Sequence, residues 1–433
     1  MVAWSLPFWP KRASASPMGW LTESVGLFED ARSSVPRAGD ARIWRGEPRG
    51  LPARIELLGW DAAAKRRESW ADLVDRALES NVFLEPNFAI PAAQHFPLAF
   101  RPSFLLVSDL SGAQPDGDLV GLTALDLPSS GHGSIARAWC PQQSALGTPL
   151  FDRARGRDAL EIMFSWFAER QPHLSGVLFP HLAASGPTAS MIRAHAVAED
   201  LEIRMLDPHE RAILSGGVDI DAMLRATVAP KKLKELRRQN RRLSDQGELA
   251  YMSARDQESV KLEVENFLSL EAKGWKGARG TALLGNPSLS TFTRTMTRLL
   301  AHEGKCRVDS LTLGGKPIAM GVVLFSAGES YLWKIAYDET YAQLSPGVQF
   351  LLEFSRRQAL ERESLYTDSC AIPDHPMINR IWPERLPIVD LLVATSRERA
   401  GAFRTAASRE QMRRRLRAMA KRAWYKMTGD SPS

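Results

Sequence analysis

Three strand-like segments follow one another closely in the C-terminal half of the chain, and they constrain the fold more than any other feature. They cover residues 306–313, 317–325 and 330–337 and are rich in branched and aromatic residues. Gly314-Gly315 and Ala327-Gly328 lie between them. Because connections this short join neighbouring antiparallel strands, the pattern predicts an antiparallel meander.

Periodic apolar residues place this meander within a defined order of elements. The expected order is a strand at 247–254, helices at 257–273 and 289–302, the meander, a helix at 346–360, and strands at 364–368 and 386–394. The C-terminal half is therefore expected to pack helices on a mixed, mainly antiparallel sheet.

This order resembles the GNAT acyltransferase fold, and three short segments add to the resemblance. They are Glu271–Gly277 (EAKGWKG), Ser345-Pro346-Gly347, and Pro373–Asn379 (PDHPMIN) followed by Trp382. As a set they resemble the CelD-like, BioF-type acetyltransferase branch. That branch is related to the FemAB peptidyltransferases and often has two GNAT-like halves. The resemblance covers the segment from about Pro230 to Thr395 well.

The first half also alternates strand-like and helix-like segments, and Gly147–Leu150 before a helix extends the resemblance there. We therefore expect an α/β (α+β) protein with two tandem GNAT-like domains, each a mixed sheet flanked by helices. The expected divisions are a disordered lead-in at 1–50, domains at 51–206 and 207–395 with a basic helix at 230–243, and a basic amphipathic tail at 396–433.

The segment Ser345-Pro346-Gly347 has the composition of an anion-binding helix start. Ser is a common N-cap, Pro suits the first helical position, and Gly lets a ligand approach the backbone. The first N–H groups of the helix would then favour the pyrophosphate of coenzyme A. An ordinary capped helix is the alternative, because Pro346 stands where the usual signature has its first Gly.

The resemblance implies acyl-CoA as co-substrate, with acetyl-CoA as the expected donor. It also implies that the strand 330–337 splays from its neighbour and pairs with the pantetheine arm. The expected cofactor contacts are Ile335, Ala336, Tyr337, Ser345, Gly347 and Val348.

An amine that attacks a thioester must first lose a proton, and three residues are candidate bases. Glu271 lies four residues after Phe267, so the helical period places a carboxylate on an apolar stripe, where it is costly unless paired. Asp368 ends a predicted strand, and His375 follows in a loop bracketed by prolines. A salt bridge from Glu271 to Lys273 or Lys276 is the structural alternative.

Many GNAT enzymes use a Tyr after the equivalent of strand 364–368 as the acid for the leaving thiolate. This chain has no Tyr in that segment, so the resemblance leaves the general acid unassigned. The resemblance does place Trp275, Lys276 and Asn379 beside the acceptor, where an aromatic ring and an ammonium suit a sugar or a carboxylated amine. Trp275 as a core residue is the alternative.

The implied reaction is acyl transfer to a primary amine, such as an amino sugar or a related metabolite of polysaccharide or envelope synthesis. Two alternatives remain open. The basic helix at 230–243 favours FemAB-type transfer from aminoacyl-tRNA, and Pro346 with the missing Tyr leaves room for a non-catalytic scaffold at the membrane surface.

Cysteine and histidine usage argues against a metal centre or a disulfide framework. Cys140, Cys306 and Cys370 are far apart, and the eight His residues are scattered. No apolar run approaches the ~20 residues that cross a bilayer. We therefore expect a cytoplasmic protein without a metal. No base-reading motif accompanies the basic helix, so no specific nucleic acid is expected as a partner.

Positive charge is concentrated near the C-terminus. Residues 397–427 contain eleven Lys/Arg and two Glu, a net charge of +9, so that the rest of the chain carries −3 of the overall +6. Apolar residues recur along one face, at Met412, Leu416, Met419, Ala423 and Met427. Such a helix can contact the inner face of an anionic membrane peripherally, or pack on an acidic surface or partner.

Overall fold

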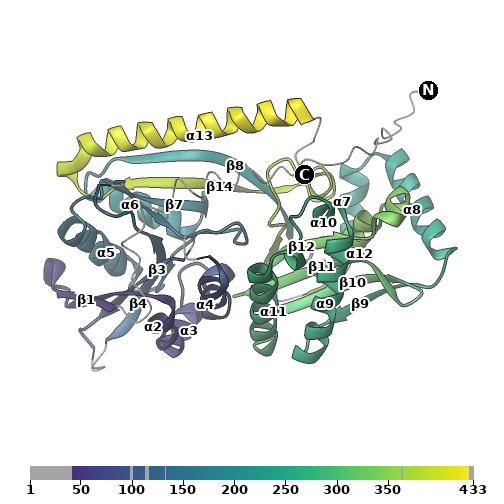
Figure 1. The fold of residues 1–433 in the computed structure, drawn as a ribbon, viewed down its shortest axis with the longest axis horizontal. Helices are drawn as coiled ribbons and strands as arrows, with labels where there is room; N and C mark the ends of the chain where they lie inside the picture. The colour runs from purple at the N-terminus through teal and green to yellow at the C-terminus, as the bar shows by residue number, and fades with distance from the viewer. Residues whose placement is uncertain (1–40, 98–100, 113–116, 132, 362–363, 429–433) are drawn as a thin grey trace.

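The computed structural model describes residues 41–97, 101–112, 117–131, 133–361 and 364–428 of the 433-residue chain. Within these residues, fourteen strands hydrogen-bond into one mixed sheet that runs through the molecule, with helices against its faces (Figure 1). Thirteen of them form the continuous order β1-β2-β3-β4-β5-β7-β14-β8-β13-β12-β11-β10-β9, and β6 pairs with β4. The expected α/β class is confirmed.

The N-terminal half supplies one end of this sheet and the helices around it. Its strands are β1 (Ala41–Gly46), β2 (Ala53–Leu58), β3 (Ser103–Asp109), β4 (Asp118–Asp126), β5 (Ile135–Ala138), β6 (Leu150–Phe151), β7 (Gly176–Ala183) and β8 (Ile203–Ser215). Its helices are α2 (Trp60–Ala64), α3 (Arg67–Asp75), α4 (Pro86–His95), α5 (Gly156–Arg170) and α6 (Pro187–Ala198).

The C-terminal half follows the order of elements expected from its sequence. Its strands are β9 (Leu249–Ala254), β10 (Cys306–Leu313), β11 (Lys316–Ser326), β12 (Glu329–Tyr337), β13 (Tyr366–Asp368) and β14 (Glu384–Ala394). Its helices are α7 (Ile220–Thr227), α8 (Pro230–Ser244), α9 (Gln257–Lys273), α10 (Trp275–Ala278), α11 (Pro287–His302), α12 (Pro346–Ala359) and α13 (Ala400–Thr428). The predicted meander is confirmed, because β10, β11 and β12 pair antiparallel in sequence.

The two halves interlock through their last long strands. β14 comes from the C-terminal half but pairs with β7, and it also pairs with β8. β8 comes from the N-terminal half but pairs with β13 as well as with β14. A division of the chain at residue 206 therefore cuts through β8, and neither half has a complete sheet without a strand of the other.

The start of the first half is more ordered than its composition predicts. Residues Ala41–Gly46 form β1, which pairs antiparallel with β2, and a 3₁₀ turn follows at Pro48–Gly50. The predicted disorder is therefore wrong from Ala41 onward, because the partner strand β2 supplies the hydrogen bonds that local sequence does not reveal. Residues 1–40 lie outside the described part of the chain.

Aromatic side chains from both halves form a shared core. Phe88 of α4 and Phe96, which directly follows this helix, pack against Phe292 of α11, with ring centroids 5.2 and 5.0 Å apart. Trp333 of β12 packs edge-on against Phe88, and its indole Nε1 donates to the carbonyl of Gln143 over 2.7 Å. These contacts fix the N-terminal half against the sheet face that carries β12.

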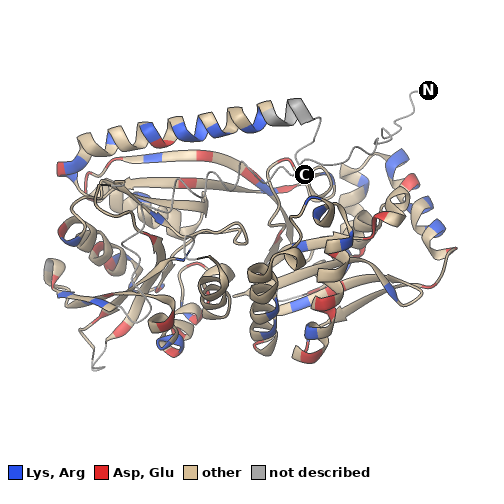
Figure 2. Ribbon diagram, viewed as in Figure 1, with Lys and Arg blue, Asp and Glu red and all other residues tan. Residues whose placement is uncertain are grey.

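Helix α13 lies along the outer side of the β8–β14 ribbon (Figure 1). Its Phe403 and Ala407 are buried against that ribbon. Lys and Arg recur along both α13 and α8 (Figure 2). Among the described residues, no helix is both long and apolar enough to cross a membrane.

Candidate active site in the C-terminal half

Strands β12 and β13 separate at their carboxyl ends. They pair in parallel only from Glu329 and Tyr366 to Tyr331 and Asp368. β13 ends there, whereas β12 continues to Tyr337. An extended ligand that carries amide groups can pair with such a free strand edge. The predicted cofactor contacts Ile335, Ala336 and Tyr337 all lie on this stretch.

A β-bulge in β12 adjoins the gap. Val323 pairs with Leu332 and Val322 pairs with Lys334, which leaves Trp333 as the extra residue. Bulges of this kind often re-aim side chains beside active sites. Here the Nζ atom of Lys334 lies 5.4 Å from the centre of the Trp333 ring.

Lys334 is the residue that the sequence interpretation missed. Burial lowers the pKa of its ammonium from 10.5 to about 8, and the positive charge of Lys276 acts in the same direction. Glu271 and Cys370 oppose the shift from the same neighbourhood. The signal available in the sequence was a single cation inside the otherwise apolar strand SYLWKIAY.

The start of α12 differs in detail from the predicted capped helix. Ser345 has a left-handed backbone (φ 54°) and its side chain makes no capping hydrogen bond, so the predicted Ser cap is wrong. The carbonyl of Ser345 instead accepts from the N–H groups of Val348 and Gln349. A Cβ on Gly347 would lie 3.1 Å from the Tyr337 ring and 3.6 Å from the Met377 sulfur. Gly347 thus lets Tyr337 and Met377 lie against the first turn.

The basic helix α8 packs beside this helix start. Gln239 of α8 donates to the carbonyl of Gln343, and Gln349 of α12 donates to the carbonyl of Leu236. Leu236 and Leu243 are buried on the face of α8 that packs on the body of the protein. The exposed cations on its other face are Lys231, Lys232, Lys234, Arg237, Arg238, Arg241 and Arg242. Their field favours an anionic ligand at the loop before α12.

Glu271 is held as a structural anchor. Only 4% of the residue is exposed, and its carboxylate accepts from Lys276 Nζ (2.6 Å) and from the Leu283 amide (2.8 Å). The structure therefore shows the salt-bridge alternative, with Lys276 as the partner. The carboxylate fixes both ends of the loop between α9 and α11.

Trp275 lies on the surface of this loop and not in the core. Its amide donates to Glu339, and its ring lies near two cations, Lys276 Nζ at 5.9 Å and the Arg279 guanidinium at 5.1 Å. Trp275 and Lys276 both belong to the short helix α10, and their predicted place beside an acceptor stays a prediction.

Asp368 ties the two halves together. It is fully buried, and its Oδ2 lies 2.8 Å from Nη2 of Arg211 on β8. Its Oδ1 accepts from the amide of Cys370, and Arg211 also donates to the carbonyl of Ala145. Burial raises the pKa of Asp368, and the guanidinium of Arg211 opposes that rise. These contacts make Asp368 a positioning residue at the edge of the gap.

One ring nitrogen of His375 accepts hydrogen bonds from the backbone of its own loop. Its Nδ1 lies 3.3 Å from the amides of Met377 and Ile378 and accepts from them. Burial lowers the pKa of the imidazole, so the neutral ring carries its proton on Nε2. In this tautomer His375 offers a donor and not a base. The amide of Asn379 donates to the carbonyl of His375, so the loop 373–379 is closed on itself.

The N-terminal half has a corresponding gap that its own chain fills. β5 and β7 pair in parallel only as far as Arg137 and Leu178. Beyond that point, the carbonyls of Gln143 and Ala145 accept from Trp333 and Arg211 of the other strands. The start of α5 is also occupied, because Asp152 Oδ1 accepts from the amides of Ala154 and Arg155.

The pocket around Asp152 is acidic. Its lining includes Asp72, Asp75, Asp109 and Asp118, beside Arg76 and Arg155. A carboxylate already fills the anion position at this helix start, and the surrounding charge repels a pyrophosphate. The helix start of α5 in the N-terminal half is therefore occupied by a carboxylate of its own chain.

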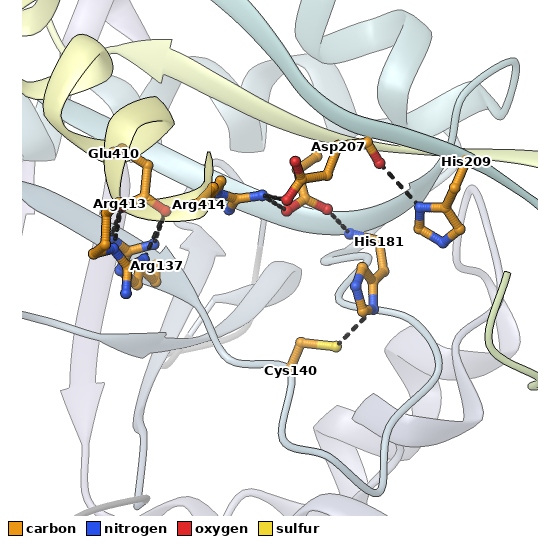
Figure 3. Close-up of polar contacts among 9 residues, drawn as sticks. Arg137, Cys140, His181, Asp207, His209, Glu410, Arg413 and Arg414 are labelled. Carbon is orange, nitrogen blue, oxygen red and sulfur yellow. Dashed lines mark hydrogen bonds and ion pairs between the residues drawn. The ribbon is translucent and has the colours of Figure 1, made fainter. Parts of the chain in front are cut away.

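The pair formed by Cys140 and His181 has no reactive thiolate. Cys140 Sγ lies 3.7 Å from His181 Nδ1 (Figure 3), but burial raises the pKa of this thiol to about 12, so it is not a thiolate near neutral pH. The described residues hold no cluster of three or more His, Cys, Asp or Glu side chains arranged to bind a metal.

Comparison with known families finds a match within the C-terminal half. Residues 230–366 match the family model described as an acetyltransferase (GNAT) domain. None of the curated proteins compared with the chain matches it.

Several solved structures are similar to the chain over most of its length. FemX is 9% identical, with 76% of this chain and 96% of that chain covered and a TM-score of 0.46. The C-terminal domain of an Agrobacterium fabrum protein named as a lysylphosphatidylglycerol synthetase is 14% identical (80% and 96% covered, TM-score 0.46). A GCN5-related N-acetyltransferase from Sphaerobacter thermophilus is 10% identical (79% and 96% covered, TM-score 0.32).

Proposed function

We propose that this protein, whose residues 230–366 form a GNAT-type acyltransferase domain, transfers an acyl group from an acyl-CoA to a primary amine. The observation that carries the proposal is the free edge of β12 beyond Tyr331, beside the helix start of α12. The edge suits the pantetheine arm, and the cations of α8 suit the phosphates. Acetyl-CoA is the simplest donor with which to test it.

The amine attacks the carbonyl carbon of the thioester held along this edge. A backbone N–H among Ile335, Ala336 and Tyr337 stabilises the oxyanion that forms. The C–N bond forms, the C–S bond breaks, and the coenzyme leaves as a thiolate. One proton must leave the ammonium before attack, and one must reach the thiolate afterwards. The attacking nitrogen also loses a second proton to solvent as the amide forms.

Lys334 is suited to move both protons. With a pKa of about 8, a fraction of its side chain is a neutral amine near neutral pH and can take a proton from the acceptor. The resulting ammonium can then return a proton to the thiolate. This assignment supplies the acid that the missing Tyr leaves vacant. It also gives Glu271 a role through Lys276, whose charge helps to keep the pKa of Lys334 low.

The acceptor is proposed to carry a negative charge or a sugar ring. The half-buried Trp275 ring lies near Lys276 and Arg279, and this arrangement suits stacking on a sugar together with a carboxylate or phosphate contact. An amino sugar derivative therefore remains the first acceptor class to test.

Release of free thiol from acetyl-CoA and mass spectrometry of a panel of amines test the reaction directly. We expect Lys334→Arg, which cannot give up its proton, to lower kcat by about 10²–10⁴ and to keep thermal stabilisation by coenzyme A. Lys316→Arg, on the exposed start of β11, is the matched control. Unchanged turnover in Lys334→Arg would remove Lys334 from the mechanism, and absence of stabilisation by any acyl-CoA would remove the function.

One observation favours a second candidate, transfer from aminoacyl-tRNA. The seven exposed cations of α8 form a surface beside the loop before α12 that is broad enough to contact a nucleic-acid backbone. Stabilisation by uncharged tRNA that falls steeply with salt, without stabilisation by coenzyme A, would favour it. No stabilisation by either ligand would favour a non-catalytic scaffold.

A further inference from the structure

We propose that the outward face of α13 binds the surface of an anionic lipid bilayer and holds the N-terminal half against it. The proposal is independent of the chemistry assigned to the C-terminal half. It depends on how α13 is attached, on what its free face presents, and on the charge of that face.

Helix α13 is firmly attached by one face. Phe403 and Ala407 are buried, and the buried Glu410 accepts from Arg137 of β5 (2.7 Å). Arg414 bridges from the same carboxylate to Asp390 of β14, at 2.6 Å (Figure 3). These contacts come from β5 and β14, so the helix is fixed in orientation before it meets any partner.

The opposite face presents an apolar stripe. Met412, Leu416 and Met419 are spaced by four and three residues, which places them in one line along the helix. They are 54%, 57% and 64% exposed. Phe403 and Glu410 point to the other side, since they lie near half a turn away at 100° per residue. The described residues of the chain therefore leave the stripe uncovered.

Cations flank this stripe on both sides. At the same helical spacing, Arg409 lies on one side of the stripe, and Arg415 and Arg422 lie on the other, and all three are exposed. Residues 411–423 contain no Asp or Glu. The face therefore combines flexible apolar side chains with a cationic border and no acidic group.

A bilayer with anionic headgroups fits this combination better than a nucleic acid does. The Arg stems can extend along the apolar stripe while their guanidinium groups reach the headgroups. The helix lies tangentially on the molecule, as a helix in a membrane interface must. A nucleic-acid backbone would match the cations and leave the stripe exposed to water. Because α13 is already ordered, binding does not have to fold it.

Flotation of the full-length protein with phosphatidylcholine vesicles, with and without 30% phosphatidylglycerol, tests the proposal. We expect partition onto the anionic vesicles only, and weaker partition in high salt. Replacing Arg409, Arg415 and Arg422 by Gln should weaken partition by about 100-fold, and Met412, Leu416 and Met419 to Ser by about tenfold or more. The proteins should keep their thermal stability, because all six side chains are exposed.

Two control variants remove the same kinds of side chain from surfaces outside α13. Lys231, Lys232 and Lys234 to Gln lower the charge equally on α8, and Val197, Met252 and Leu262 to Ser remove equally exposed apolar side chains. Both controls should partition like the wild type. The proposal would be overturned if the controls lost partition equally, if the stripe variant still partitioned like the wild type, or if the protein bound neutral vesicles. Loss of a concentration-dependent dimer in the stripe variant, without vesicle binding, would assign the face to a second copy of the chain.

Discussion

Replacing Lys334 by Met should make the protein more stable and abolish its activity. Burial lowers the pKa of Lys334 from 10.5 to about 8, so the folded state is penalised whenever this side chain is charged. One pKa unit corresponds to about 1.4 kcal/mol, so the full shift is worth about 3 kcal/mol at pH 7. Because part of the side chain reaches solvent, we expect a gain of about 2–3 kcal/mol from Lys334→Met.

The pH dependence identifies the cause. Between about pH 8 and 10.5 the unfolded state binds more protons at this lysine than the folded state, so the stability of the wild type rises with pH across that window. The advantage of the Met variant should therefore be complete below pH 8 and vanish by about pH 10.5. Taking the difference in the free energy of unfolding between the two proteins removes the contribution of all other titrating groups, because both proteins contain them.

Urea denaturation at a series of pH values measures this difference, and Lys316→Met on the exposed start of β11 is the control. The control should change stability by less than about 0.5 kcal/mol. A Met variant that is less stable than the wild type at pH 7, or an advantage that does not change with pH, would refute the reasoning. In that case contacts would stabilise the charged form of Lys334 in the folded protein, and its burial would not lower the stability of the fold.

Three further substitutions test the site and its supports. Glu271→Gln keeps an acceptor for the Leu283 amide but loses the charge opposite Lys276, so denaturation should show a loss of about 1–3 kcal/mol, with faster hydrogen exchange in 274–285. Gly347→Ala places a methyl 3.1 Å from the Tyr337 ring, so coenzyme A should stabilise the variant less, while its own stability stays within about 1 kcal/mol. Glu410→Ala should free α13 at a cost of about 2–3 kcal/mol, measured as faster tryptic cleavage within it. Burial disfavours ionisation of Glu410, but hydrogen bonds from Arg137 and its neighbours hold its pKa well below its usual range, so the wild type should lose this docking only as the pH falls below about 4.

The order of helices and strands in the C-terminal half could be predicted because it depends on patterns between residues that are close in the sequence. Two-residue turns define the strands of the meander, and apolar periodicity defines α9 and α11, so 306–337 and 257–302 follow from the sequence. The interlocking of β8 and β14 could not be predicted in this way. Their pairing joins residues such as Arg204 and Leu392, which are far apart in the chain, and an apolar strand gives no sign of which neighbour it chooses.

In the candidate site, too, the features set by local sequence could be predicted and those set by long-range pairing could not. The position of the gap follows from the order of elements, whereas the environment of Lys334 depends on a bulge at Trp333 that only the pairing register reveals. Glu271 was correctly singled out as a carboxylate on an apolar stripe, but its pairing with Lys276 depends on the turn after α9. On α13, the docking face escaped prediction because its centre is Glu410, a charged residue buried among arginines.

The two halves have similar strand orders, but their proposed roles differ. In the N-terminal half the gap beyond β5 is filled by the segment that contains Gln143, and the carbonyl of Gln143 holds the indole of Trp333. Trp333 is the bulged residue of β12, and Lys334 follows it at the mouth of the open gap. The filled gap of one half therefore fixes the bulge that orients Lys334 in the other. In the proposed mechanism the N-terminal half would therefore contribute without binding coenzyme A, by holding the bulge of β12 that precedes Lys334.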